Sequence, residues 1–153
     1  MNDRDAAVVG DTWFESTRAF PVSRARLFRA WTDSTELARW WGPAGFKNTF
    51  HEHSVRPGGD WRFTMHGPNG ESFENHSVYR EIVDGERLVI EHKSAPQFVA
   101  TVTFVDDGAG SSRVRWRMTF ATAAELDKIK TFAIPGNEQN LDKLAALLSA
   151  ASP

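Results

Sequence analysis

The feature that most constrains the fold is a run of strand-like segments between residues 46 and 120. Alternation of apolar and polar residues is typical of half-buried strands, and Asn-Gly and Asp-Gly pairs mark the turns between them. Because short turns join consecutive strands, we expect antiparallel pairing. The pattern predicts six strands, at residues 46–55, 60–66, 72–83, 87–93, 97–105 and 112–120.

Two short helices are predicted between an earlier strand and this run. Residues 12–20 alternate as a strand. Ser23 is a suitable N-cap for a first helix, and Ser34 for a second one that Gly42-Pro43 ends.

A long helix is predicted at the C-terminal end, because Thr122 and Glu125 form a capping box. We expect it to break near Pro135-Gly136 and to resume to about Ala150. One face of each strand is apolar, and this helix is the long amphipathic element that can cover it. The predicted fold is α+β, with a curved antiparallel sheet of about seven strands wrapped around the C-terminal helix.

Composition excludes several classes of protein. The chain has no cysteine, which excludes disulfide scaffolds, thiol nucleophiles and cysteine-ligated zinc. Its net charge of -2 disfavours nucleic-acid binding. Residues 1–10 show no secretory signal, and no apolar run is long enough for membrane insertion. We therefore expect a cytoplasmic protein, with a flexible tail over residues 1–10 and a single domain over residues 11–151.

The order of elements resembles the helix-grip fold of the START-like (SRPBCC, Bet-v-type) superfamily. Five local motifs occur in order along the chain: FRAWTDSTELARWWGPAGF at 28–46, RPGGDWRFTMHGPNG at 56–70, YREI at 79–82, ERLV at 86–89 and NLDKLAALL at 140–148. They are similar to those of the activator-of-heat-shock-protein-90-ATPase-like family. Ser54 departs from the family pattern, in which an acidic residue is expected.

Aromatic residues on several strands indicate a cavity between the sheet and the C-terminal helix. The chain holds six tryptophans and eleven phenylalanines, which shape cavities as well as cores. The alternative is a core that these rings fill completely. The resemblance implies a cavity for a small hydrophobic or aromatic ligand. The candidate ligand-binding residues are Trp40, Trp41, Trp61, Phe63, Met65, His76, His92, Phe98, Trp116 and Met118.

Polar residues on the central strands are the candidates for chemistry. His92 shares a strand face with Leu88 and Ile90, so we expect it to point inward. His92 and His76 either make structural hydrogen bonds or act as general acid-base groups. The facing of Tyr79 and Arg80 stays open, because a β-bulge is plausible there.

No metal site or cofactor is predicted. His51 and His53 are two residues apart and would share a strand face, but no third ligand accompanies them. Phosphate-binding, GxSxG and dinucleotide motifs do not occur in the sequence.

Three functions remain open. The first is binding of a small hydrophobic ligand, and the second is a polyketide-cyclase-like or hydrolase-like enzyme that uses the same cavity. The third is a co-chaperone or protein-interaction module. The sequence does not separate a carrier from a catalyst, and it does not fix the oligomeric state. The arginines at 113, 115 and 117 form a basic stripe that fits either a solvated face or a homodimer contact.

Overall fold

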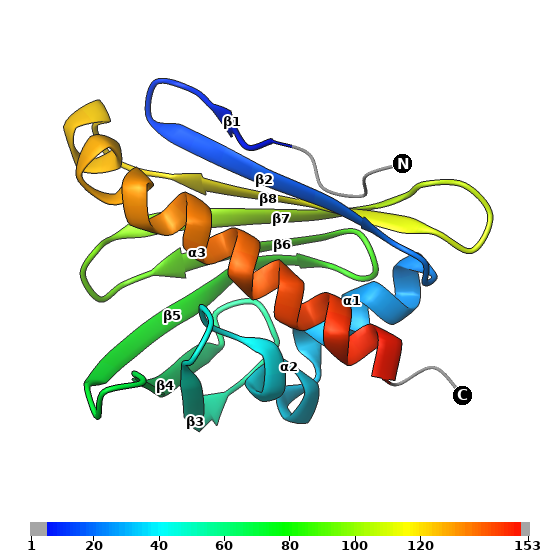
Figure 1. Ribbon diagram of the computed structural model, residues 1–153, viewed down its shortest axis with the longest axis horizontal. Coiled ribbons are helices and arrows are strands. Elements are labelled where there is room, and N and C mark those ends of the chain that lie inside the picture. Colours follow the sequence, from blue (N-terminus) through cyan, green and yellow to red (C-terminus); the bar gives the residue numbers. More distant parts are fainter. Residues whose placement is uncertain (1–5, 151–153) are drawn as a thin grey trace.

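The computed structural model describes residues 6–150 of the 153-residue chain. Figure 1 shows α3 lying diagonally across one face of a curved antiparallel sheet, with α1 and α2 beside its C-terminal half. The sheet has eight strands in the order β1-β2-β8-β7-β6-β5-β4-β3. The elements are β1 (Val8–Val9), β2 (Trp13–Phe20), α1 (Arg24–Thr32), α2 (Ser34–Trp40), β3 (Lys47–His53), β4 (Asp60–His66), β5 (Ser72–Val83), β6 (Arg87–His92), β7 (Phe98–Asp106), β8 (Ser112–Thr119) and α3 (Ala123–Ala150).

The predicted fold class is confirmed, because a helix-grip arrangement of sheet and C-terminal helix is observed. The additional strand is β1, whose Val8 and Val9 pair with Glu15 and Phe14 of β2. The expected tail is therefore wrong at these two residues, and residues 1–5 lie outside the described part of the chain. Within residues 6–150, no helix has the length and apolar character needed to span a membrane.

The caps of the two short helices come from neighbouring side chains. Ser23 caps α1 as predicted, and its Oγ accepts a hydrogen bond from the backbone N–H of Arg26 at 3.1 Å. The N-cap of α2 is Asp33, whose carboxylate accepts from the Glu36 N–H at 3.0 Å. The prediction of Ser34 as this cap is wrong, because Ser34 is already helical and a carboxylate at the preceding position satisfies the free N–H.

Helix α3 is continuous through Pro135, so the predicted break near Pro135-Gly136 is wrong. The capping box is confirmed, since Thr122 Oγ1 accepts from the Glu125 N–H at 3.1 Å. A proline inside a helix costs about 3 kcal/mol through its missing N–H and its ring. Burial of α3 side chains on both sides of the proline, from Leu126 to Leu144, offsets this cost.

An ion-pair cluster fixes α3 to the sheet. Arg18 of β2 donates hydrogen bonds to Asp142 at 2.7 Å and to Glu138 at 2.9 Å. Its side chain is only 5% exposed. A buried guanidinium needs such partners, so this contact sets where the helix crosses the sheet.

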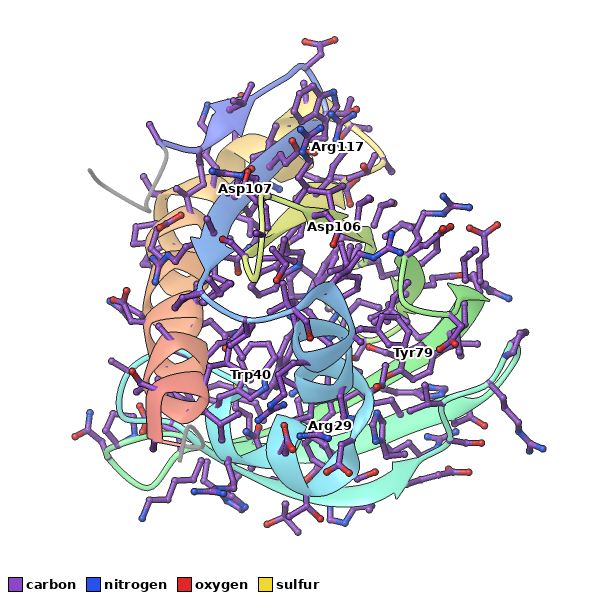
Figure 2. The ribbon with its side chains drawn as sticks, turned by 90° about the vertical axis from the view of Figure 1, so that its right-hand side faces the viewer. Arg29, Trp40, Tyr79, Asp106, Asp107 and Arg117 are labelled. Atoms are coloured by element: carbon purple, nitrogen blue, oxygen red, sulfur yellow. The ribbon has the colours of Figure 1, made fainter. Side chains whose placement is uncertain are left out.

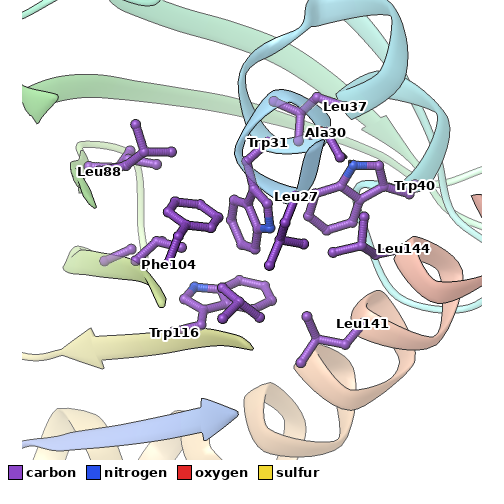
Figure 3. Close-up of a cluster of buried hydrophobic side chains, with 14 of the residues drawn as sticks. Leu27, Ala30, Trp31, Leu37, Trp40, Leu88, Phe104, Trp116, Leu141 and Leu144 are labelled. Carbon is purple, nitrogen blue, oxygen red and sulfur yellow. Dashed lines mark hydrogen bonds between the residues drawn. The ribbon is translucent and has the colours of Figure 1, made fainter. Parts of the chain in front are cut away.

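A solid hydrophobic cluster fills one end of the space between α3 and the sheet. Figure 3 shows Trp31 of α1 between Trp40, Phe104 and Trp116. The rings of Trp31 and Trp116 meet edge to face, with centroids 5.1 Å apart. Seen from the end of the molecule, α1 closes this side of the space (Figure 2). The C-terminal half of α3 therefore rests on a packed core.

Candidate ligand-binding pocket

A pocket of about 320 Å³ lies under the N-terminal half of α3, beyond the packed core. The helix contributes residues from Ile129 to Asn140, and the sheet contributes inward-facing residues of β4 to β8. The volume lies within the range of small-molecule sites. The walls are mainly aromatic and aliphatic side chains, with a few polar groups among them.

All but two of the predicted ligand-binding residues line this pocket. The strand alternation explains why they converge, because Trp61 and Phe63 of β4 and Trp116 and Met118 of β8 point to the same face of the sheet. The lining members of the predicted set are Trp41, Trp61, Phe63, Met65, His92, Phe98, Trp116 and Met118.

Trp40 and His76 do not line the pocket. Trp40 is fully buried in the core, and its indole N–H donates to the carbonyl of Ala30 at 2.9 Å. His76 lies on the outer face of β5, where its Nε2 is 2.8 Å from Asp60 Oδ1. This hydrogen bond lowers the pKa of Asp60. Adjacent side chains of a strand point to opposite faces of the sheet. The residues on either side of His76, Asn75 and Ser77, therefore point inward and line the pocket.

A bulge in β5 resolves the facing of the next two residues. The register with β6 shifts between Tyr79 and Glu81. Tyr79 points inward and is fully buried, and its burial raises the pKa of its hydroxyl. Arg80 lies on the outer side and forms an ion pair with Glu91. Arg80 therefore supplies no charge to the pocket.

His92 is the titratable side chain in the pocket wall. Its Nδ1 donates to the Pro96 carbonyl at 2.8 Å, and its Nε2 lies 2.9 Å from Asn75 Oδ1. The ring stacks on Phe98 with centroids 4.7 Å apart. Burial lowers the pKa of His92, so the neutral imidazole is the favoured form at neutral pH.

Helix α3 adds two buried asparagines to the pocket. Asn140 Oδ1 accepts from the Gly42 N–H at 3.2 Å. Asn137 Nδ2 lies 3.3 Å from the Met118 sulfur, which is a weak acceptor. Neither asparagine was among the predicted site residues, because hydrophobic periodicity assigns polar residues of a helix to its solvent face. The available signal was their spacing, because each asparagine lies four residues before a leucine, Leu141 or Leu144, and so shares its helix face.

The loop at one side of the pocket, residues 41–46, is held by polar side chains of α3. The Ala44 N–H donates to Gln139 Oε1 at 3.1 Å. Lys143 Nζ lies between 3.1 and 3.5 Å from three loop carbonyls. Burial lowers the pKa of Lys143. Phe132 also lines the pocket and is 80% exposed, so the pocket opens to solvent beside it.

The two histidines of β3 do not share a face as predicted. The register between β3 and β4 shifts between Phe50 and Glu52, so a bulge at His51 reverses the alternation. His53 pairs with inward-facing Trp61, whereas His51 bonds to Thr64 on the outer side at 2.7 Å. Among residues 6–150, no three His, Cys, Asp or Glu side chains gather in a way that could hold a metal ion.

His53 is expected to make the stability of the protein depend on pH. Its ring nitrogens lie 2.6 Å from Ser34 Oγ and 2.7 Å from Tyr79 Oη. Burial lowers the pKa of His53 from 6.5 to about 4, although nearby Asp33 opposes the shift. Between these values the unfolded chain binds a proton that the folded chain does not. The contribution of His53 to the free energy of unfolding is therefore complete above pH 6.5 and is lost as the pH falls toward 4.

We expect this loss to be about 1 to 2 kcal/mol, after allowance for solvent screening of the half-buried ring. Urea unfolding as a function of pH measures it. His53→Gln should flatten the curve between about pH 6.5 and 4. His66→Gln, at the last residue of β4, is the matched control. Identical curves for His53→Gln and the unmodified protein would contradict the assignment.

Known proteins resemble this chain in sequence pattern and in fold. The family model "Activator of Hsp90 ATPase homolog 1-like protein" matches residues 21–149. A Mycobacterium smegmatis structure has a TM-score of 0.86 at 22% identity, covering 97% of this chain and 99% of that one. A structure from Arthrobacter aurescens has a TM-score of 0.87 at 22% identity, covering 96% of this chain and 92% of that one. A structure from Chromobacterium violaceum has a TM-score of 0.79 at 25% identity, covering 88% of this chain and 96% of that one. No curated protein matches the chain.

Proposed function

The chain belongs to the Activator of Hsp90 ATPase homolog 1-like family, and from this premise we propose that it binds a small hydrophobic or aromatic ligand between the sheet and α3. The observation that supports this proposal is the pocket of about 320 Å³ with aromatic walls, beside a core of buried aromatic and aliphatic side chains. Elements from α1 to α3 contribute to its wall. This supports residues 11–151 acting as one domain.

The expected affinity follows from the apolar surface that a ligand would bury. A two-ring aromatic compound buries roughly 200 Å², which contributes about 5 kcal/mol at ~25 cal/mol per Å². Contacts from the protein walls add to this, and the loss of translational freedom opposes it. Dissociation constants in the micromolar range are the expected outcome.

Catalysis in the same pocket has weaker support. Of the three groups considered for it, only His92 lines the pocket, while His76 and Arg80 lie on the outer face. Nδ1 of His92 is bound to the Pro96 carbonyl, and the side chains of Asn75 and Ser94 cover Nε2 at 2.9 and 3.4 Å. A general base needs a free nitrogen within reach of its substrate, so the arrangement favours binding.

A role as a protein-interaction module also has weaker support. That function needs a continuous exposed apolar patch. The large apolar side chains that are exposed in residues 6–150 are spread over four elements: Val8 and Val9 on β1, Phe73 on β5, Val99 on β7 and Phe132 on α3. Phe132 also belongs to the pocket.

Displacement of a neutral fluorescent dye tests the proposed binding. N-phenylnaphthylamine is expected to bind at one site per chain, with a rise in its fluorescence. Apolar compounds from a panel of sterols, polyketide-like aromatics and fatty alcohols should displace it. Native mass spectrometry of the gently purified protein provides an independent readout. Absence of binding by both methods would refute the proposal.

A further inference from the structure

We propose that the ligand is an uncharged aromatic compound that carries a hydroxyl or carbonyl group, rather than a carboxylate or an amine. The inference rests on the proposed binding function and defines its ligand class. It follows from two properties of the pocket wall: the absence of a charged side chain among the described lining residues, and the presence of buried polar atoms with unused hydrogen-bonding capacity.

No full charge faces a ligand in the described pocket wall. Apart from His92, every lining side chain is apolar or a neutral serine or asparagine, and burial keeps the pKa of His92 low. The neighbouring cations are directed elsewhere. Arg18 pairs with carboxylates of α3, and Lys143 binds backbone carbonyls of the 41–46 loop. Acidic side chains are likewise missing from the described lining.

Five side chains in this wall keep hydrogen-bonding capacity. Two are Trp31 and Trp61, whose buried indole N–H groups have no partner within residues 6–150. Ser77 on the sheet side is 3% exposed and lines the pocket, so its hydroxyl faces the space that a ligand would occupy. On the helix side, Asn140 uses its Oδ1 for Gly42, which leaves its Nδ2 available. Asn137 uses its Nδ2 for the Met118 sulfur, which leaves its Oδ1 available. The wall thus offers a hydroxyl, an amide donor, an amide acceptor and two indole donors.

This chemistry selects for neutral ligands. A carboxylate or ammonium loses its hydration on entering an apolar pocket, and only an opposite charge compensates for that loss. A hydroxyl or carbonyl loses less, and it regains hydrogen bonds from Ser77 or the asparagines. Selectivity for neutral over charged analogues of equal size is the expected result.

Calorimetric titration with matched naphthalene derivatives tests this selectivity on the unmodified protein. Naphthol is expected to bind at least tenfold more tightly than naphthoate and naphthylmethylammonium at neutral pH. Naphthoate should bind more tightly as the pH falls toward the pKa of its carboxyl group, about 4, because the neutral acid is the form that enters. The affinity for naphthol over the same pH range corrects for titration of the protein.

A pair of serine variants tests the hydrogen-bonding part. Ser77→Ala should weaken naphthol binding about threefold to tenfold and leave methylnaphthalene, which lacks a hydroxyl group, unaffected. Ser16→Ala is the matched control. Ser16 is also fully buried, its Oγ has no hydrogen-bond partner within the described part of the chain, and it lies outside the pocket wall.

The outcomes separate this inference from the proposed function. Naphthoate or naphthylmethylammonium binding as tightly as naphthol at neutral pH would overturn the ligand class and leave hydrophobic binding intact. The class would also be wrong if the dye and panel compounds bound but no neutral naphthalene derivative did. Failure of every compound, including the dye, would refute both.

Discussion

Replacement of Ala100 by phenylalanine is expected to weaken ligand binding at least thirtyfold while the chain stays folded. Ala100 lies on the inward face of β7, in register with Ile90 of β6 and Met118 of β8, and it lines the pocket. A phenyl ring at this position would occupy much of the 320 Å³ that a ligand needs. Because the ring fills existing space, we expect a change in unfolding free energy of no more than about 1 kcal/mol.

Thr101→Phe is the matched control for this variant. Thr101 follows Ala100 on the same strand and points to the other face of the sheet. The substitution therefore adds the same phenyl ring away from the pocket. Dye titration and calorimetry should show unchanged affinity for Thr101→Phe. Retention of full affinity by folded Ala100→Phe would mean that ligands bind elsewhere.

Replacement of Arg18 by leucine should cause a large loss of stability, about 3 kcal/mol. The guanidinium is 5% exposed and bonds to Glu138 and Asp142 of α3. Its removal leaves the Glu138 carboxylate, itself only 19% exposed, without this cation. Breaking a buried pair on one side costs far more than the pair contributes when intact.

Arg115→Leu provides the comparison on the neighbouring strand. Arg115 is exposed on β8, opposite Thr17 of β2. Arg115 forms no ion pair within residues 6–150, and loss of such an exposed arginine is expected to change the free energy of unfolding by less than about 0.5 kcal/mol. Chemical denaturation of both variants decides the point. Equal and small effects would show that Arg18 does not anchor α3.

The strands and most of the pocket wall were predictable because the alternation of β4 and β8 is regular. Turns at Asn69-Gly70 and Asp84-Gly85 fix where strands end, and a period of two then decides which side chains share a face. Trp61, Phe63, Trp116 and Met118 followed directly from that period.

The errors arose where one residue changes the face of a side chain. Bulges at His51 and after Tyr79 reverse the alternation, and a bulge has no sharp signature in sequence. On β5 both faces are mixed, so the inward set of Asn75 and Ser77 could not be distinguished from the set that includes His76.

Tertiary packing overrode local sequence signals in the helices. Trp40 ends α2 and Trp41 has extended backbone, so the two adjacent rings point in different directions and only Trp41 lines the pocket. Pro135 normally ends a helix, but contacts along the whole length of α3 keep it continuous. The inward asparagines of α3 depend on the same contacts.

The tryptophans provide the most direct test of binding in this pocket. Four of them, Trp31, Trp41, Trp61 and Trp116, line it, whereas Trp13 stacks with Arg117 away from the pocket. Each indole N–H gives a separate signal in a ¹H–¹⁵N correlation spectrum, and ring currents of an aromatic ligand shift nearby signals.

Titration with naphthol, followed by NMR, is therefore the decisive measurement. Saturable shifts of the indole signals of Trp41, Trp61 and Trp116, with the Trp13 signal unchanged, are the expected result. Shifts confined to surface residues, or no shift of these indoles at saturating concentrations of a ligand that calorimetry shows to bind, would contradict binding between the sheet and α3.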